Sequence, residues 1–583
     1  MNNIIAKLAE DGVLDAESAQ QVEAALAAGR PLDEALRAAK KVPEEAILRH
    51  LADYFDVPFI DLERDGAKYA PSKELLAKFP ARILLDHRIM PIAANGDGDG
   101  DGGGVTVVTS KLFDMTAIDE LRLASGIEVR TAIAPSAEIE RFTKNYLGVG
   151  ADTLQSMGLN DEEDVKVLEE QHEDDLDLTH AAQDASIIRF VNQVLAEALE
   201  MRATDVHVEP FEDQLRVRYR IDGVLREANI PPQVRKYQAA IVSRLKILSH
   251  LDIAEKRLPQ DGRIRLRVAG REIDLRVSVI PMIHGEAVVL RILDRGDTLL
   301  GLEHLGMSKR DRIAWERVLD LPHGIILVTG PTGSGKTTTL YAALSKINKA
   351  DLKIVTIEDP VEYQLRGINQ IQVNNKSGLT FAAGLRAILR HDPDVVLIGE
   401  IRDRETAEIA VQASLTGHLV FSTLHTNDAP GAATRLVDMG VEPYLVASSL
   451  ETVAAQRLVR LICPACRERM AEEDVEKLRS EFGADVPDVV YHGRGCRNCQ
   501  DSGYRGRQGV FEMMPITDEI RTQVLARNSS RDLRRTAMMQ GMTSLRDDGW
   551  RLIAEGKTTP QEVLRVTKDE EVAIATPEIS SIR

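Results

Sequence analysis

The sequence predicts a multidomain α/β protein in which small α+β domains precede a larger domain with a mostly parallel sheet. At 583 residues the chain is too long for a single core, and roughly three to five domains are expected. From about residue 301, short apolar runs alternate with helical segments, which is typical of a parallel sheet with helices on both faces. Before that point, residues 215–221 alternate between apolar and basic side chains and lead into Asp222-Gly223, which predicts a hairpin of a small α+β domain.

The composition is that of a soluble globular protein, with 43% hydrophobic and 28% charged residues. The net charge of −19 argues against a chain dominated by nucleic-acid binding, so no nucleic-acid partner is expected. No apolar run approaches the length that crosses a bilayer, and residues 1–10 lack the basic and apolar segments of a signal peptide. We therefore expect a cytoplasmic protein whose association with a membrane is peripheral.

Changes in composition divide the chain. A helical unit is expected up to about residue 60, and residues 88–93 and 105–109 are expected to pair as strands. Residues 161–177 hold ten carboxylates and one lysine, a run that repels itself and predicts an extended linker. The predicted organisation is an N-terminal region (1–150, helical unit plus α+β), an acidic linker (151–183), a second N-terminal α+β domain (184–300), an α/β domain (301–568) and a loose tail (569–583).

The strongest chemical signal is Gly330-Pro331-Thr332-Gly333-Ser334-Gly335-Lys336-Thr337, which matches the phosphate-binding P-loop pattern. Residues 324–329 before it predict a buried strand, and residues 338–344 after it predict a helix that begins at Thr338. This arrangement aims backbone N–H groups and a helix N-terminus at a polyphosphate. Residues 330–338 are therefore expected to bind ATP or GTP in a RecA-like domain, with Lys336 at the β- and γ-phosphates and Thr337 holding Mg²⁺.

Two acidic segments follow later strands of the same domain. Glu358 and Asp359 come directly after the apolar run 353–357, where a strand end would place them at the ligand edge of the sheet. Glu400 follows the apolar run 395–398, but Gly399 stands where many P-loop ATPases carry an aspartate that binds magnesium. Glu400 is therefore the best candidate for the general base or the group that orients water, and Glu358 or Asp359 is expected to share the metal role.

Histidines and cysteines mark two further features. His418 and His425 flank the apolar run 419–424, and both are expected to sense the γ-phosphate. The only four cysteines form two C-x-x-C pairs, separated by 29 residues, within an element at about 460–505: Cys463, Cys466, Cys496 and Cys499. Each pair can hold one edge of a tetrahedral ion, and disulfides are disfavoured in the cytosol. The spacing predicts a closed, structural Zn²⁺ site.

Together these motifs resemble the secretion ATPases of the type II secretion and type IV pilus assembly class (GspE/PulE/PilB-like). The resemblance is strong over about 184–570 and weaker over 1–150. Residues 389–403 look like the family's signature around its Walker B glutamate, and 356–362 look like its Asp box. His418 and His425 fall in its His box, residues 258–264 and 218–223 are similar to motifs of its second N-terminal domain, and the four cysteines fit its assembly members.

The resemblance implies a homo-hexameric ring that hydrolyses ATP with Mg²⁺ while the second N-terminal domain rotates against the ATPase domain. Arginines of that domain would then reach the γ-phosphate; Arg218 is the first choice and Arg235 the second. The motion would drive an inner-membrane platform protein that assembles a pilus or pseudopilus. Residues 1–150 would dock on a cytoplasmic partner at the inner membrane. Arg216, Arg218 and Arg220 also fit a solvated strand face.

Three other functions stay open on the sequence. A DNA-translocating or conjugation-type ring ATPase would bind DNA in a salt-dependent way, although the acidic charge weighs against it. A weakly hydrolysing, ATP-binding regulatory scaffold is disfavoured by Lys336, Glu358 and Glu400. A retraction motor is disfavoured by the cysteine pairs and the long N-terminal region.

Overall fold

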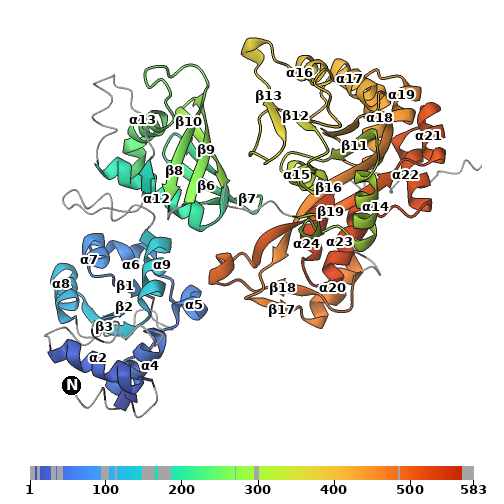
Figure 1. The fold of residues 1–583 in the computed structure, drawn as a ribbon. Coiled ribbons are helices and arrows are strands. Elements are labelled where there is room, and N and C mark those ends of the chain that lie inside the picture. The colour runs from blue at the N-terminus through green and yellow to red at the C-terminus, as the bar shows by residue number, and fades with distance from the viewer. Residues whose placement is uncertain are drawn as a thin grey trace, which may run out of the picture. The chain divides into compact units, whose positions relative to one another are not determined.

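The computed structural model describes residues 5, 7–9, 13–27, 35, 44–93, 104–111, 114–147, 165–167, 185–268, 271–294, 301–482 and 486–567. Contacts divide the chain into two units, Met1–Asp294 and Arg295–Arg583, each described by itself below (Figure 1). The predicted tail over 569–583 lies outside the described residues. No helix among the described residues is both long and apolar enough to cross a membrane.

The N-terminal region holds helices followed by a small three-stranded sheet. The sheet has the order β1-β2-β3, with β1 antiparallel to β2 and β2 parallel to β3. The pairing expected between 88–93 and 105–109 is therefore confirmed, and α8 makes the crossover that a parallel pair requires. The elements are α2 (Ala16–Ala27), α4 (Glu44–Phe55), α5 (Leu62–Asp65), η1 (Gly66–Tyr69), α6 (Lys73–Ala77), α7 (Ala81–Asp86), β1 (Met90–Ile92), β2 (Gly104–Thr109), α8 (Met115–Ser125), β3 (Glu128–Ile133) and α9 (Ser136–Leu147).

The next part of the first unit is a seven-stranded antiparallel sheet of order β4-β8-β9-β10-β5-β6-β7. Alternate residues of its strands form an apolar core with helices α12 and α13, because successive strand residues point to opposite faces. The elements are β4 (Val165–Val167), α12 (Ala185–Glu200), β5 (Ala203–Pro210), β6 (Leu215–Ile221), β7 (Val224–Glu227), η2 (Pro232–Tyr237), α13 (Gln238–Leu248), β8 (Gln260–Val268), β9 (Arg271–Met282) and β10 (Gly285–Asp294).

Strand β4 is a difference from the sequence prediction, because it lies inside the run expected to be an extended linker. Val165 pairs with Val268 and Val167 pairs with Leu266 at the edge of the sheet. Two valines in alternation suit a strand, and the edge of β8 offers backbone groups that a further strand can pair with. The other residues of 151–183 lie outside the described part of the chain.

The second unit contains the mostly parallel sheet that the sequence predicts, in the order β13-β12-β14-β15-β11-β16-β19. All its neighbouring strands are parallel except β16 and β19. The elements that build it are η3 (Leu302–His304), α14 (Lys309–Leu319), β11 (Gly324–Thr329), α15 (Lys336–Ile347), β12 (Ile354–Glu358), β13 (Asn369–Gln372), η4 (Asn375–Ser377), α16 (Phe381–Ile388), β14 (Val395–Ile398), α17 (Arg404–Leu415), β15 (Leu419–Leu424), α18 (Ala429–Asp438), α19 (Pro443–Ser449), β16 (Leu450–Ile462) and β19 (Tyr504–Pro515).

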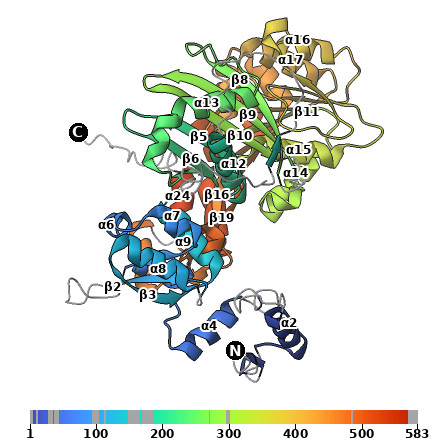
Figure 2. The ribbon, with the colours of Figure 1, turned by 90° about the vertical axis from the view of Figure 1, so that its left-hand side faces the viewer.

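Helices cover both faces of this sheet (Figures 1 and 2). On β11, Ile326 and Val328 pack with α14 and α15, whereas Ile325 and Leu327 belong to the core that contains α16–α19. The strands are buried on both faces, which explains why they are continuous apolar runs. The remaining elements are β17 (Arg467–Arg469), α20 (Glu472–Phe482), β18 (Tyr491–Gly493), η5 (Arg497–Cys499), α21 (Asp518–Leu525), α22 (Ser530–Met539), α23 (Leu545–Ala554) and α24 (Pro560–Thr567).

Candidate functional site

The P-loop connects the end of β11 to the start of α15. Gly330, Gly333 and Gly335 have φ angles of 148°, 77° and 90°, a region that favours glycine. Gly335 is the N-cap of α15, so the N-cap residue itself has no side chain that could accept a hydrogen bond from the first turn of this helix. The first backbone N–H groups of α15 are therefore available to an anion, and the helix dipole favours a negative charge there.

The floor of the loop is formed by Gln456 and Arg457 of β16. A Cβ atom on Gly330 would lie 2.5 Å from the Gln456 carbonyl oxygen and 3.1 Å from Arg457 Nη1. A Cβ atom on Gly335 would lie 2.8 Å from Gln456 Nε2. Both glycines are thus required by the close approach of β16 as well as by their φ angles. Gln456 is fixed in turn, because Thr339 Oγ1 donates to its Oε1 over 2.8 Å.

Sequence reasoning missed these two floor residues. The one available signal was a polar Gln-Arg pair inside the apolar run 453–459, which suggests a polar atom facing something other than core.

The residues of the loop fit a phosphate group. Lys336 Nζ donates to the carbonyl oxygens of Gly330 (2.8 Å) and Pro331 (3.1 Å), which holds the ammonium group at the loop. Burial lowers the pKa of Lys336 to about 8; Glu400 opposes this shift and Arg457 adds to it. Among the described residues, Ser334 Oγ is buried without a hydrogen-bond partner. Thr337 and Thr338 lie half-buried in the first turn of α15, so the role of Thr337 toward Mg²⁺ stays a prediction.

Glu400 follows β14 at the same edge of the sheet as the P-loop. Its side chain is 13% exposed; Oε1 lies 2.5 Å from Arg402 Nη2, and Oε2 lies 3.3 Å from His425 Nε2. The hydrogen bond with Glu400 raises the pKa of Arg402. A Cβ atom on Gly399 would lie 3.2 Å from the Cα of Glu358, so a larger residue there would be tightly packed against the end of β12.

His425 lies at the site, whereas His418 does not. His425 directly follows β15, whose last residue Leu424 pairs with Thr329 next to the P-loop. His418 precedes the same strand, and its carbonyl oxygen accepts from Gly324 N at the opposite edge of the sheet. A six-residue strand separates the two histidines by about 20 Å. The expectation that both sense the same γ-phosphate is therefore corrected: within one chain, only His425 can do so. His418 Nδ1 lies 2.8 Å from the Ala413 carbonyl oxygen.

Glu358 ends β12 as expected, but its carboxylate is buried. The side chain is 4% exposed, and Thr356 Oγ1 donates to Oε1 over 2.6 Å. Tyr341 of α15 donates to Oε2, and Gln370 of β13 donates to Oε1 over 3.3 Å. Neutral donors from three elements thus surround this group, which differs from the open carboxylate expected of a metal ligand. Asp359, the other candidate, is exposed.

The predicted arginines lie in the first unit, and the P-loop lies in the second. Arg218 Nε and Nη2 donate to Glu209 over 2.8 and 2.6 Å, which raises the pKa of Arg218. Arg235 Nη2 donates to the Glu212 carbonyl oxygen over 3.5 Å. Both side chains are half-buried, and their contact with ATP stays a prediction.

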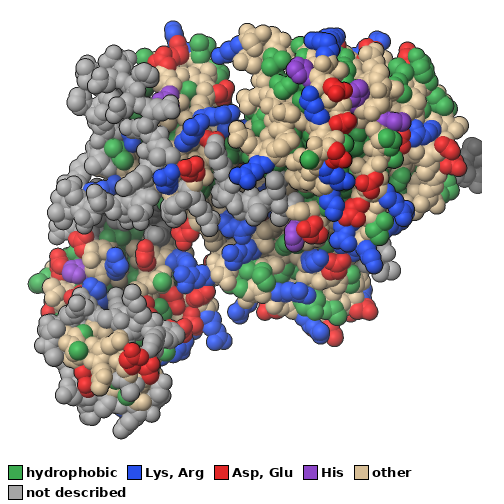
Figure 3. All heavy atoms as spheres, viewed as in Figure 1, with side chains coloured by type: hydrophobic (Ala, Val, Ile, Leu, Met, Phe, Trp, Pro, Cys, Tyr) green, Lys and Arg blue, Asp and Glu red, His purple; other side chains and the backbone are tan. Residues whose placement is uncertain are grey.

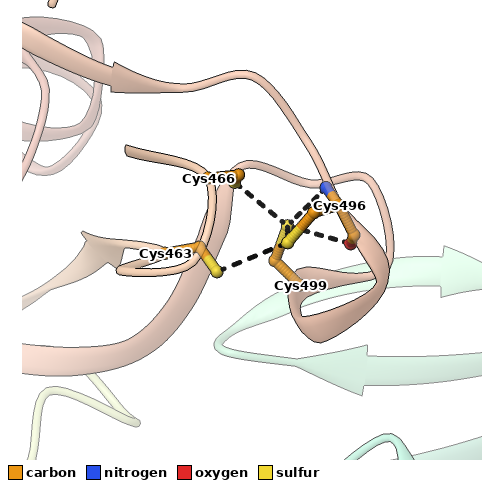
Figure 4. Close-up of side chains that lie close together, drawn as sticks. All are labelled: Cys463, Cys466, Cys496 and Cys499. Carbon is orange, nitrogen blue, oxygen red and sulfur yellow. Dashed lines mark hydrogen bonds between the residues drawn. The ribbon is translucent and has the colours of Figure 1, made fainter. Parts of the chain in front are cut away.

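The four cysteines converge between the start of β17 and η5 (Figure 4). Their Sγ atoms all lie within 4.8 Å of one another, with 3.8 Å between Cys463 and Cys496, 3.7 Å between Cys466 and Cys499, and 3.8 Å between Cys496 and Cys499. A tetrahedral zinc ion with Zn–S bonds of about 2.3 Å separates its sulfurs by about 3.8 Å, whereas a disulfide needs about 2.05 Å. The four thiols therefore fit a closed zinc site.

Comparison with known proteins places the chain in a family. The type II/IV secretion system protein family matches residues 180–565, and the MshEN domain matches residues 55–152. The chain belongs to the type II/IV secretion system protein family. The resemblance drawn from the motifs is confirmed, and with it the secretion ATPase class.

Curated relatives carry names from both branches of the class. The type II secretion system protein E of Pseudomonas aeruginosa is 54% identical over 407 residues, which cover 70% of this chain and 80% of that protein. The type IV pilus assembly ATPase PilB of Myxococcus xanthus is 42% identical over 530 residues, which cover 90% of this chain and 91% of that protein. Among solved structures, the pilus retraction motor PilT with bound ADP is 26% identical, with a TM-score of 0.44 and coverage of 65% of this chain and 97% of PilT.

Proposed function

We propose that this secretion ATPase is a motor for filament assembly, which works as a homo-hexamer and adds subunits to a pilus or to a pseudopilus for type II secretion. Two kinds of observation support the proposal. Relatives at 54% and 42% identity are named for type II secretion and for type IV pilus assembly. The carboxylate of Glu400 lies beside His425 and close enough to Lys336 to oppose the lowering of its pKa by burial, and this grouping at the P-loop edge carries the proposal.

The proposed chemistry assigns a role to each group at this edge. A bound Mg²⁺–ATP would supply the electrophilic γ-phosphoryl group. Lys336 would bind the β- and γ-phosphates, and Thr337 would hold the magnesium ion. Glu400 orients the attacking water and accepts its proton, while Arg402 and His425 fix the direction of the carboxylate. We assign Glu358 to positioning, because its oxygens already accept from Thr356, Tyr341 and Gln370.

The remaining proposals concern the metal, the location and the partners. A structural Zn²⁺ held by the four cysteines is supported by the sulfur spacing. The protein would act in the cytoplasm, peripheral to the inner membrane, on a platform protein. Its N-terminal region would dock on a cytoplasmic partner. Acidic and basic side chains both occur across the visible face of the second unit (Figure 3).

Replacing Glu400 tests the catalytic proposal. Glu400→Gln keeps the shape of the side chain but cannot accept a proton, so kcat for ATP should fall about a hundredfold or more. Glu408→Gln is the matched control, because Glu408 is a surface carboxylate that pairs with Arg404 over 2.7 Å. Steady-state ATP turnover of both variants tests whether Glu400 is the catalytic carboxylate. ADP binding checks that each variant is folded. Unchanged turnover in Glu400→Gln would refute the role of Glu400.

A further inference from the structure

Arg457 is a buried cation that no motif of the sequence singles out. It lies on β16, the strand next to β11, and is 7% exposed. Its Nη1 atom would be 3.1 Å from a Cβ atom on Gly330, so the guanidinium group packs directly against the first glycine of the P-loop. A charge in such a place costs free energy unless something of opposite charge or a set of acceptors compensates it.

The same guanidinium group reaches the segment that follows His425. Arg457 Nη2 donates to the Asn427 carbonyl oxygen over 2.8 Å, and Nη1 donates to the Gln456 carbonyl oxygen over 3.1 Å. The segment is also joined to the P-loop strand, because Thr329 and Thr426 share a hydroxyl hydrogen bond of 2.7 Å. Arg457 therefore touches both the loop that would hold the phosphates and the segment that carries His425.

We propose that Arg457 is a positioning residue of the ATPase site, which fastens the P-loop to the His425 segment and places a second positive charge beside Lys336. The proposal rests on the proposed function, since it assumes that the P-loop binds a nucleotide. The guanidinium group acts through Lys336 and His425, with two different consequences. Its charge adds to the field that attracts phosphate. Its hydrogen bond to the Asn427 carbonyl oxygen holds the segment of His425, so that His425 stays beside Glu400.

The test compares Arg457→Gln and Arg457→Lys in the full-length chain. Binding of fluorescently labelled ADP, and kcat and KM for ATP, are measured at about pH 7.5. Arg457→Gln should bind ADP about three- to tenfold more weakly than the wild type, because it loses the positive charge. Arg457→Lys keeps the charge but cannot donate to both carbonyls, so its ADP affinity should match the wild type while kcat falls about tenfold.

The matched control is Arg460→Gln, three residues further along β16. Arg460 is mostly buried and pairs with Glu562 over 2.5 Å, away from the P-loop. This variant should lower the melting temperature without changing the ADP affinity. The proposal is overturned if Arg457→Gln keeps the wild-type ADP affinity, kcat and KM, or if Arg457→Lys keeps the wild-type kcat. If Arg457→Gln does not fold, Arg457→Lys alone decides through its kcat. Failure of the proposed function would appear separately, as a wild-type chain that binds ADP but does not turn over ATP.

Discussion

Glu358 lies at the strand end that the sequence predicts, but its carboxylate accepts hydrogen bonds from neighbouring side chains and is not open to a metal ion. Tyr341 from the P-loop helix and Gln370 from β13 both donate to its carboxylate. Gln370 also accepts from Leu365 N over 2.7 Å and donates to the Tyr363 carbonyl oxygen over 3.2 Å. Glu358 therefore orders the loop after β12, which carries the exposed Asp359, through partners that reach that loop.

The contacts of Glu358 predict that its carboxylate supports the fold of the site and does not bind magnesium. Glu358→Gln should leave the Mg²⁺ concentration needed for half-maximal ATP turnover unchanged, because a buried group held by neutral donors does not bind the metal.

Tyr341→Phe should lower the free energy of unfolding by about 1–3 kcal/mol, since it leaves a buried acceptor with one donor fewer. Magnesium titrations of ATP turnover and denaturant unfolding give both quantities. Asp359→Asn serves as the comparison for the metal requirement. A clearly raised magnesium requirement in Glu358→Gln would restore the metal role to Glu358.

At the scale of elements, local patterns predicted the P-loop, the alternation of strands and helices, and the cysteine cluster. A strand, a glycine loop and a helix are set by neighbours in sequence. The position of His418 was also open to prediction, because a residue before a parallel strand lies at the opposite edge from one after it. The burial of Glu358 and the approach of Arg457 to Gly330 could not be predicted from the sequence. Both depend on contacts with α15 or β16 between residues that are far apart in the chain.

The cysteine element makes a prediction of its own. Purified protein should contain about one zinc ion per chain, and Cys499→Ser should lose most of it, because three thiolates and a hydroxyl bind zinc weakly. Hydrogen exchange should then rise in β17 and β18, which lie beside the cysteines. Elemental analysis and hydrogen exchange of the whole chain measure both effects, with chelator-treated wild type as the parallel sample. A zinc-free protein with protected β17 and β18 would contradict the assignment.

Helix α9 in the N-terminal region carries a titration that should be visible in stability. Burial raises the pKa of Glu138 to about 7, despite a hydrogen bond of 2.9 Å from Leu62 N. The folded state then binds more protons than the unfolded state between about pH 4.5 and 7, so stability should fall as the pH rises through that window. Glu138→Gln should melt like the wild type near pH 4.5 and at a higher temperature above pH 7. Scanning calorimetry of the full chain tests this, with exposed Glu140→Gln as the control. Equal wild-type and Glu138→Gln melting temperatures above pH 7 would contradict it.

At the scale of the whole molecule, the residues of the proposed ATPase site lie in one unit and the proposed arginines lie in the other. The second unit holds the P-loop, Glu400 and His425 on one sheet edge. The first unit holds the arginines proposed to reach the nucleotide, and Arg218 there is already paired with Glu209. If such an arginine acts on ATP, the first unit must approach a P-loop. Arg218 must then either leave Glu209 or contact Glu209 and the phosphate together. A ring of identical chains offers that approach, which is why turnover should depend on assembly.

The most direct test is the rate of ATP hydrolysis per chain as a function of protein concentration, with the mass of the same samples determined by light scattering. The account predicts that turnover rises as chains of 64.4 kDa assemble into a species of about six copies. Full turnover by a monomer would contradict the motor as described. A six-copy ring that hydrolyses nothing, even with lipid present, would favour the regulatory scaffold instead.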